Sequence, residues 1–113
     1  MTGNVEILET LTGDPIMDEA ILKIQKLAPE YAKIRSKRIN LESLKPVRRA
    51  LLMVSAEKKG ISSVSGQEKE AYSSSAYLEL LKNIEELSIK ELELEWSLKL
   101  NELIISARLV LRK

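Results

Sequence analysis

The chain has 113 residues, 44% of them hydrophobic and 31% charged, with a formal net charge of +1. It contains no cysteine and no histidine, which excludes disulfides, thiolate chemistry and the usual general base near neutral pH. Aromatic residues make up only 4% of the chain, so the core must come from aliphatic side chains, as in helix-on-helix packing. The sequence lacks both a membrane-spanning apolar run and a leader-like pattern. We therefore expect a soluble, cytoplasmic protein without a cofactor or metal.

The charges are strongly segregated along the chain. Residues 1–22 carry a net charge of −5, residues 23–59 carry +8, and residues 60–113 carry −2. Such segregation indicates either a polyanionic partner for the middle segment or pairing of that segment with acidic helices.

Helix start and stop signals divide the first half of the chain. Residues 1–13 are ambiguous, because glycines and threonines interrupt the helical spacing of Val5, Leu8 and Leu11. The Asp14-Pro15 pair predicts an N-cap followed by the first helical position. We expect a helix over residues 15–28 and another over residues 29–59, kinked or divided near Pro46 and stopped by Gly60.

Residues 60–76 contain two glycines and six serines, which is typical of a turn between helices. Ser65 and Glu68 have the spacing of a capping box, which predicts one short helical turn over residues 66–72. Residues 73–75 are all serine and supply an N-cap for a long terminal helix over residues 77–113.

The terminal segment has no Gly or Pro and is rich in strong helix formers. Residues 92–100 alternate apolar and polar side chains, which is also the period of a half-buried strand. We favour the helix, because these nine residues include no β-branched side chain and no turn signal.

On a helix, the apolar residues of this segment fall on two stripes. One stripe is Leu78, Leu81, Ile89, Leu92, Trp96, Leu103, Ala107 and Val110, and the other is Leu80, Ile84, Leu87, Leu94, Leu98, Ile105 and Leu109. Two stripes require two neighbours, so we predict one contact with the hairpin partner and one with a second subunit. The residues predicted for the subunit interface are Leu87, Leu94, Leu98, Ile105 and Leu109.

The predicted fold is therefore all-α, with a single domain over residues 1–113. Residues 29–59 would pair with residues 77–112 as a long antiparallel hairpin whose turn covers about residues 60–76. The short helix over residues 15–28 would pack alongside.

The basic middle segment is the strongest candidate for a functional site. Mobile Lys and Arg side chains on a helix can meet successive phosphates and give salt-sensitive binding of single strands. The alternative is a surface that pairs with acidic helices. The predicted nucleic-acid-binding residues are Lys33, Arg35, Lys37, Arg38, Lys45, Arg48, Arg49, Lys58 and Lys59, with Tyr72 as a residue that stacks on bases.

Two other sets of residues have simpler interpretations. Trp96 lies on an apolar stripe, so we expect it in the core or an interface. The paired carboxylates Glu85-Glu86 and Glu91/Glu95 have no histidine beside them, so we expect neither a catalytic nor a metal site, and the protein is not expected to be an enzyme.

Short motifs from Tyr31 onward resemble a family of small bacteriophage proteins encoded among recombination and replication functions. The residues that carry the resemblance are Tyr31-Ala32-Lys33, Ala56-Glu57, Glu68-Lys69-Glu70-Ala71-Tyr72, Tyr77-Leu78-Glu79-Leu80-Leu81 and Glu95-Trp96-Ser97-Leu98. The general plan is also similar to that of the T4-type recombination mediator family of UvsY. This resemblance implies a homo-oligomer that binds single-stranded DNA and works with a recombinase and a single-strand-binding protein.

The functional expectation is thus a phage-encoded, single-stranded nucleic-acid-binding accessory protein of recombination or replication. The alternative is a non-enzymatic adaptor or assembly subunit whose basic segment pairs with acidic helices.

Overall fold

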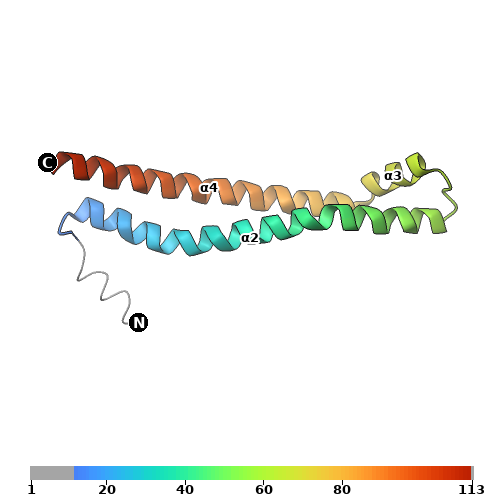
Figure 1. Cartoon of the computed structure of the whole chain (residues 1–113), viewed down its shortest axis with the longest axis horizontal. Coiled ribbons are helices and arrows are strands. Elements are labelled where there is room, and N and C mark those ends of the chain that lie inside the picture. The colour runs from blue at the N-terminus through green and yellow to red at the C-terminus, as the bar shows by residue number, and fades with distance from the viewer. Residues whose placement is uncertain (1–11, 113) are drawn as a thin grey trace, which may run out of the picture. The chain divides into compact units, whose positions relative to one another are not determined.

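The computed structural model describes residues 12–112, which form three helices and no strand, so the prediction of an all-α protein is confirmed. Helix α2 covers Pro15–Lys58, α3 covers Val64–Ser73 and α4 covers Ser75–Leu111 (Figure 1). Residues 92–100 lie within α4, which confirms their helical interpretation. The helical spacing of Val5, Leu8 and Leu11 falls outside the described residues.

Helix α2 begins as its sequence predicts. The Asp14 side chain accepts hydrogen bonds from the backbone N–H groups of Ile16 at 3.0 Å and Met17 at 3.3 Å. Asp18 in the first turn accepts bonds from the Thr12 backbone N–H at 2.9 Å and the Thr12 hydroxyl at 2.7 Å. Together these bonds satisfy donors at the helix end and place two carboxylates near its positive pole.

Helix α2 continues through both Pro29 and Pro46 to Lys58, so the predicted helix end before Pro29 and the predicted division near Pro46 do not occur. A helical proline deprives the carbonyl four residues earlier of its donor. These carbonyls belong to Gln25 and Glu42, which are exposed, as are both prolines, so water can hydrate the free groups. The separate helix predicted over residues 15–28 is therefore the first part of α2.

Gly60 ends α2 with φ +103°, a left-handed conformation that glycine adopts without steric cost. The Ile61 N–H then donates to the Ala56 carbonyl at 3.1 Å, which closes the helix end. The buried Gln67 side chain donates to the Ile61 carbonyl at 2.9 Å and ties the following helix to this turn.

Helix α3 is longer than predicted and begins earlier. Its N-cap is Ser63, whose hydroxyl accepts from the Gly66 N–H at 3.1 Å, so the predicted cap at Ser65 lies inside the helix. Within the predicted serine run, Ser74 caps α4 by accepting from the Tyr77 N–H at 3.1 Å.

The contacts of the chain fall into two compact units. Within the described residues, unit 1 contains residues 12–32 and 92–112, and unit 2 contains residues 33–91. Both α2 and α4 therefore contribute to each unit. The single domain predicted over residues 1–113 stays a prediction.

In unit 1, the first part of α2 packs against the last part of α4. The side chains of Met17, Ala20 and Leu94 are buried there. Arg108 on α4 donates through Nε to the Asp14 carboxylate at 2.8 Å, so the N-cap of α2 is also an ion-pair partner of α4. This hydrogen bond lowers the pKa of Asp14.

In unit 2, residues 33–58 of α2 pack against α3 and the first part of α4. The buried apolar side chains of this unit are Ala56, Ala71, Tyr77, Leu80 and Ile84. Ala71 has no exposed surface and Ala56 is 1% exposed, which allows a close approach of the backbones that carry them.

The two apolar stripes of α4 exist, but their roles differ from the prediction. Leu94, predicted to contact a second subunit, is buried inside unit 1, and Leu87, Leu98 and Ile105 on the same stripe are half-buried. Leu109 is exposed. On the other stripe only Leu81 is half-buried and the remaining residues are exposed, so most of the face that was expected to meet the hairpin partner is exposed in this chain.

The four large side chains of this exposed stripe that lie in unit 1 form what we call the α4 stripe: Leu92, Trp96, Leu103 and Val110. Trp96 is 60% exposed, so it does not lie in the core of this chain, and its predicted place in an interface stays a prediction. The Lys99 ammonium lies 5.1 Å from the Trp96 ring centroid and 3.7 Å from a Glu95 carboxylate oxygen.

Candidate nucleic-acid interface

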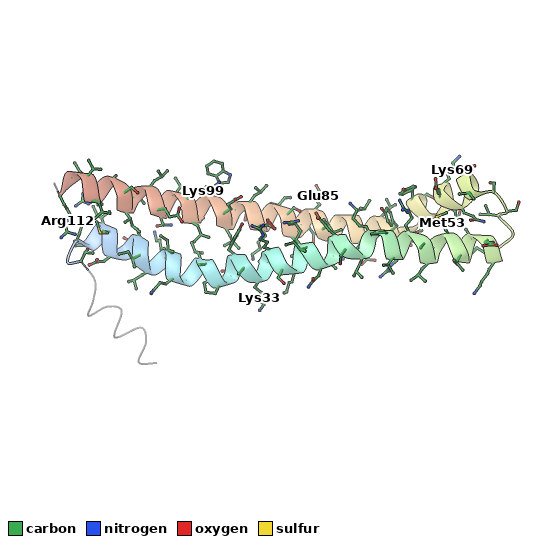
Figure 2. All side chains as sticks on the ribbon, viewed as in Figure 1. Lys33, Met53, Lys69, Glu85, Lys99 and Arg112 are labelled. Carbon is green, nitrogen blue, oxygen red and sulfur yellow. The ribbon has the colours of Figure 1, made fainter. Side chains whose placement is uncertain are left out.

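All ten residues predicted to bind nucleic acid belong to unit 2, nine of them on α2 or just after it and Tyr72 on α3. Figure 2 shows Lys33 on the side of α2 that points away from α4. The ten residues do not form one surface, because two of the arginines are engaged within the unit.

Arg38 is committed to carboxylates of its own chain. Its guanidinium donates to both oxygens of Glu91, through Nε to Oε1 and through Nη2 to Oε2 at 3.2 Å. A third contact joins Nη1 to Glu42, one helical turn along α2, at 3.2 Å. The Arg38 side chain is 19% exposed and that of Glu91 is 14% exposed. The forked geometry makes this pair a structural link between α2 and α4 within unit 2.

This pairing shifts both pKa values in the direction that favours the charged forms. The hydrogen bond from Arg38 lowers the pKa of the Glu91 carboxyl, and Arg35 contributes further attraction. The hydrogen bond to Glu91 raises the pKa of the Arg38 guanidinium. Both groups are therefore fully charged at neutral pH, and Arg38 is not available to a phosphate.

Arg49 and Tyr72 also engage each other. Arg49 Nη1 donates to the Tyr72 hydroxyl at 2.9 Å, and the guanidinium carbon lies 5.9 Å from the Tyr72 ring centroid. The Tyr72 and Tyr77 rings also pack edge to face, with centroids 5.5 Å apart and planes at 77°. Tyr72 is 44% exposed, but its hydroxyl and ring already have partners, which weakens its predicted role in stacking on bases.

Five cations remain, and they form what we call the basic face: Lys33, Lys37, Arg48, Lys58 and Lys59. At 100° per residue, these five positions fall within an arc of about 100° on α2 and the turn after it. All five are exposed. No carboxylate within residues 12–112 forms an ion pair with any of them. Of the other predicted cations, Lys45 is half-buried and Arg35 lies in the field of Glu91.

An exposed apolar row runs along the same side of α2. We call it the α2 stripe: Leu44, Val47, Leu51 and Val54, each between 42% and 63% exposed. Successive members are three or four residues apart, so they lie on one side of the helix. At 100° per residue, the basic face overlaps one edge of the α2 stripe and extends beyond it on that side. The sequence analysis assigned no role to this row.

Two buried polar residues were not predicted from the sequence. Gln67 and Asn101 are buried polar side chains, and Asn101 donates to the Ser97 carbonyl at 2.7 Å on its own helix. Neither stands out in the sequence, because a single amide among charged residues reads as an ordinary surface position. By contrast, an ion pair at Glu91 could be predicted from the sequence, because Glu91 belongs to the acidic helix that the alternative interpretation paired with the basic segment.

Within residues 12–112 there is no group of acidic, cysteine or histidine side chains that could hold a metal ion. No helix in this part of the chain is long and apolar enough to cross a membrane. Comparisons with protein-family models, curated proteins and solved structures find no match to this chain.

The Arg38–Glu91 pair predicts how stability depends on pH. Because the folded pKa of Glu91 is lowered, the pair stabilises the fold above the ordinary glutamate pKa of about 4.3 and is lost as the pH falls through the lower folded value. We expect the urea midpoint, followed by circular dichroism, to stay level from about pH 8 to 6 and to fall below about pH 4. Glu91→Gln should lower the midpoint at neutral pH and flatten the acid limb. An acid limb as steep in Glu91→Gln as in the wild type would contradict this assignment.

Proposed function

We propose that this protein binds single-stranded nucleic acid through the basic face of α2 in unit 2. The observation that carries the proposal is the set of five exposed cations that have no carboxylate partner in the described part of the chain. Other cations of unit 2, such as Arg38 and Arg49, bind side chains of the same unit, whereas these five cations do not.

The proposed mechanism is electrostatic. Each Lys or Arg that neutralises a phosphate releases condensed counterions, which favours binding and makes it sensitive to salt. The cations extend from Lys33 to Lys59, so they can follow a backbone along the helix rather than read individual bases. Binding should therefore be tolerant of sequence. A role beside a recombinase, as in the recombination mediators that the sequence resembles, is the finer form of this proposal.

A salt titration tests the proposal. For single strands, the slope of log K against log salt is about −0.7 per neutralised phosphate, so the five cations together predict about −3.5. Replacing Lys33 and Lys37 with alanine should flatten the slope by about 1.4, since two contacts are lost. Anisotropy of a labelled oligonucleotide, measured over a range of salt concentrations, gives both slopes.

The matched control removes the same charge elsewhere in unit 2. Lys69 and Lys82 are exposed on α3 and α4 and lie outside the basic face. The Lys69→Ala/Lys82→Ala variant should keep the wild-type slope. Equal losses in both double variants, or no binding at low salt, would refute the site.

A second candidate function has its own supporting observation. The α2 stripe is a row of exposed aliphatic side chains along one edge of the basic face, as expected for a surface that receives another helix. In that case the protein is an adaptor or assembly subunit, and the cations select an acidic helix. This candidate predicts that Leu51→Asp abolishes partner binding while oligonucleotide binding is absent throughout.

A further inference from the structure

The α4 stripe has the periodicity of a helix-pairing seam. Trp96, Leu103 and Val110 recur every seven residues, and Leu92 lies four residues before Trp96. A seven-residue apolar repeat on an exposed helix face is the pattern by which helices pack side by side. All four side chains are more than half exposed.

Three carboxylates lie beside this seam, along with Lys99, which contacts Trp96 and Glu95. Glu95 and Glu102 each precede a seam residue, again with a spacing of seven, and Glu93 follows Leu92. Positions next to a seam are where ion pairs between helices set the choice of partner. A helix that docks on the α4 stripe should therefore be basic beside its own apolar residues.

The α2 stripe meets that requirement. Lys37, Leu44, Leu51 and Lys58 also recur every seven residues, so the apolar seam continues into a lysine at each end. Arg48 lies beside the seam between its two leucines. The cations of α2 lie at the ends of its apolar row and along one side of it, whereas the carboxylates of α4 lie on both sides of its apolar row.

We propose that the α2 stripe of one molecule binds the α4 stripe of a second copy of this chain. Leu44, Leu51 and their neighbours would pack against Trp96 and Leu103 of the other copy, with Arg48 and the lysines facing the glutamates. This contact does not depend on nucleic-acid binding.

Charge disfavours the two symmetric alternatives. Pairing of α2 with α2 would bring Lys37 and Lys58 against lysines of the other copy within the seam, in either orientation. Pairing of α4 with α4 would crowd Glu93, Glu95 and Glu102 of both copies along one seam. Like charges at a contact suppress such pairings.

The two stripes are different surfaces, so two copies can combine them in two ways. If both stripes of each copy engage the same partner, the result is a closed dimer with two α2–α4 contacts. If only one contact forms between two copies, each pair retains an unused α2 stripe and an unused α4 stripe, and association continues into a ring or a filament.

Two single variants and their mixture test this arrangement. Leu51→Asp blocks the α2 stripe and Leu103→Asp blocks the α4 stripe, and both positions are more than 60% exposed, so the fold should survive. In sedimentation velocity, the wild type should form a dimer or a larger species, and each variant alone should be a helical monomer. The equimolar mixture should form a one-to-one dimer, because each variant supplies the stripe that the other has lost.

Other outcomes overturn the proposal. A monomeric wild type at tens of micromolar, or a mixture that stays monomeric, rules out the contact. A dimer formed by either variant alone indicates a symmetric contact through its intact stripe. Oligonucleotide binding, measured on the same samples, shows separately whether the proposed function holds.

Charge reversal provides a second route if an aspartate variant fails to fold. Replacing Glu95 and Glu102 with lysine should abolish assembly, and so should replacing Lys37 and Lys58 with glutamate. Mixing these two reversed variants should restore a pair through inverted charges. Assembly that persists in both reversed variants would show that these charges do not choose the partner.

Discussion

Replacing Leu94 with aspartate is expected to unfold unit 1, whereas the same change at Leu92 should leave it folded. Leu94 is 8% exposed and Leu92 is 53% exposed, although only one residue separates them. A buried, unpaired carboxylate costs about 3 kcal/mol or more, a large share of the roughly 5–15 kcal/mol that stabilises an ordinary domain. At an exposed site the same change usually costs within about 0.5 kcal/mol.

Urea unfolding followed by circular dichroism measures both effects. Each variant should be prepared in the Leu103→Asp background, so that assembly does not contribute to the comparison. Equal midpoints for the Leu92 and Leu94 variants would contradict the orientation of α4. A Leu92 variant less stable than the Leu94 variant would show that the originally predicted orientation is correct.

Nucleic acid is expected to dissociate the assembled protein. The proposed phosphate contacts and the proposed α2–α4 contact both require Lys37, Arg48 and Lys58, so one surface has two competing occupants. A saturating oligonucleotide should convert the larger species into oligonucleotide-bound monomers, which is a complete loss of the assembly peak in sedimentation. By linkage, raising the protein concentration should weaken the apparent affinity for the oligonucleotide.

The Leu103→Asp variant is the matched control for this competition. It keeps every cation of the basic face but has lost the α4 stripe, so no second copy can cover that face. Its apparent affinity should be at least that of the wild type and should not change with protein concentration. An assembly that retains its size while it binds oligonucleotide would separate the two surfaces and refute the competition.

Much of the fold could be predicted because local signals specify it. Asp14 and Pro15 mark the start of α2, Gly60 marks its end, and the terminal segment has nothing that would interrupt a helix. The prolines misled because the loss of one backbone hydrogen bond at each was expected to end or divide the helix, and it does not. Pro29 and Pro46 leave carbonyls that water can reach, a property of tertiary placement that local sequence does not carry.

The orientation of α4 could not be predicted for a related reason. Two apolar stripes of similar content face different directions, and periodicity alone does not decide which one is covered. The deciding contacts are distant in sequence, such as Arg38 with Glu91 and Asp14 with Arg108. The Arg38–Glu91 contact also removes Arg38 from the predicted nucleic-acid-binding site. The sequence identifies the cations, but it does not show which of them already have a partner within the chain.

The single tryptophan of the chain lies in unit 1, and its position gives the protein a built-in optical probe. Tryptophan emission depends on the water around the indole, so an exposed Trp96 should emit at long wavelength and shift to the blue when another helix covers the α4 stripe. Emission would also report unfolding near Trp96 in unit 1, whereas ellipticity follows the helices of both units. Coincident transitions by the two signals would identify the chain as one cooperative unit, and separate transitions would give each unit a stability of its own.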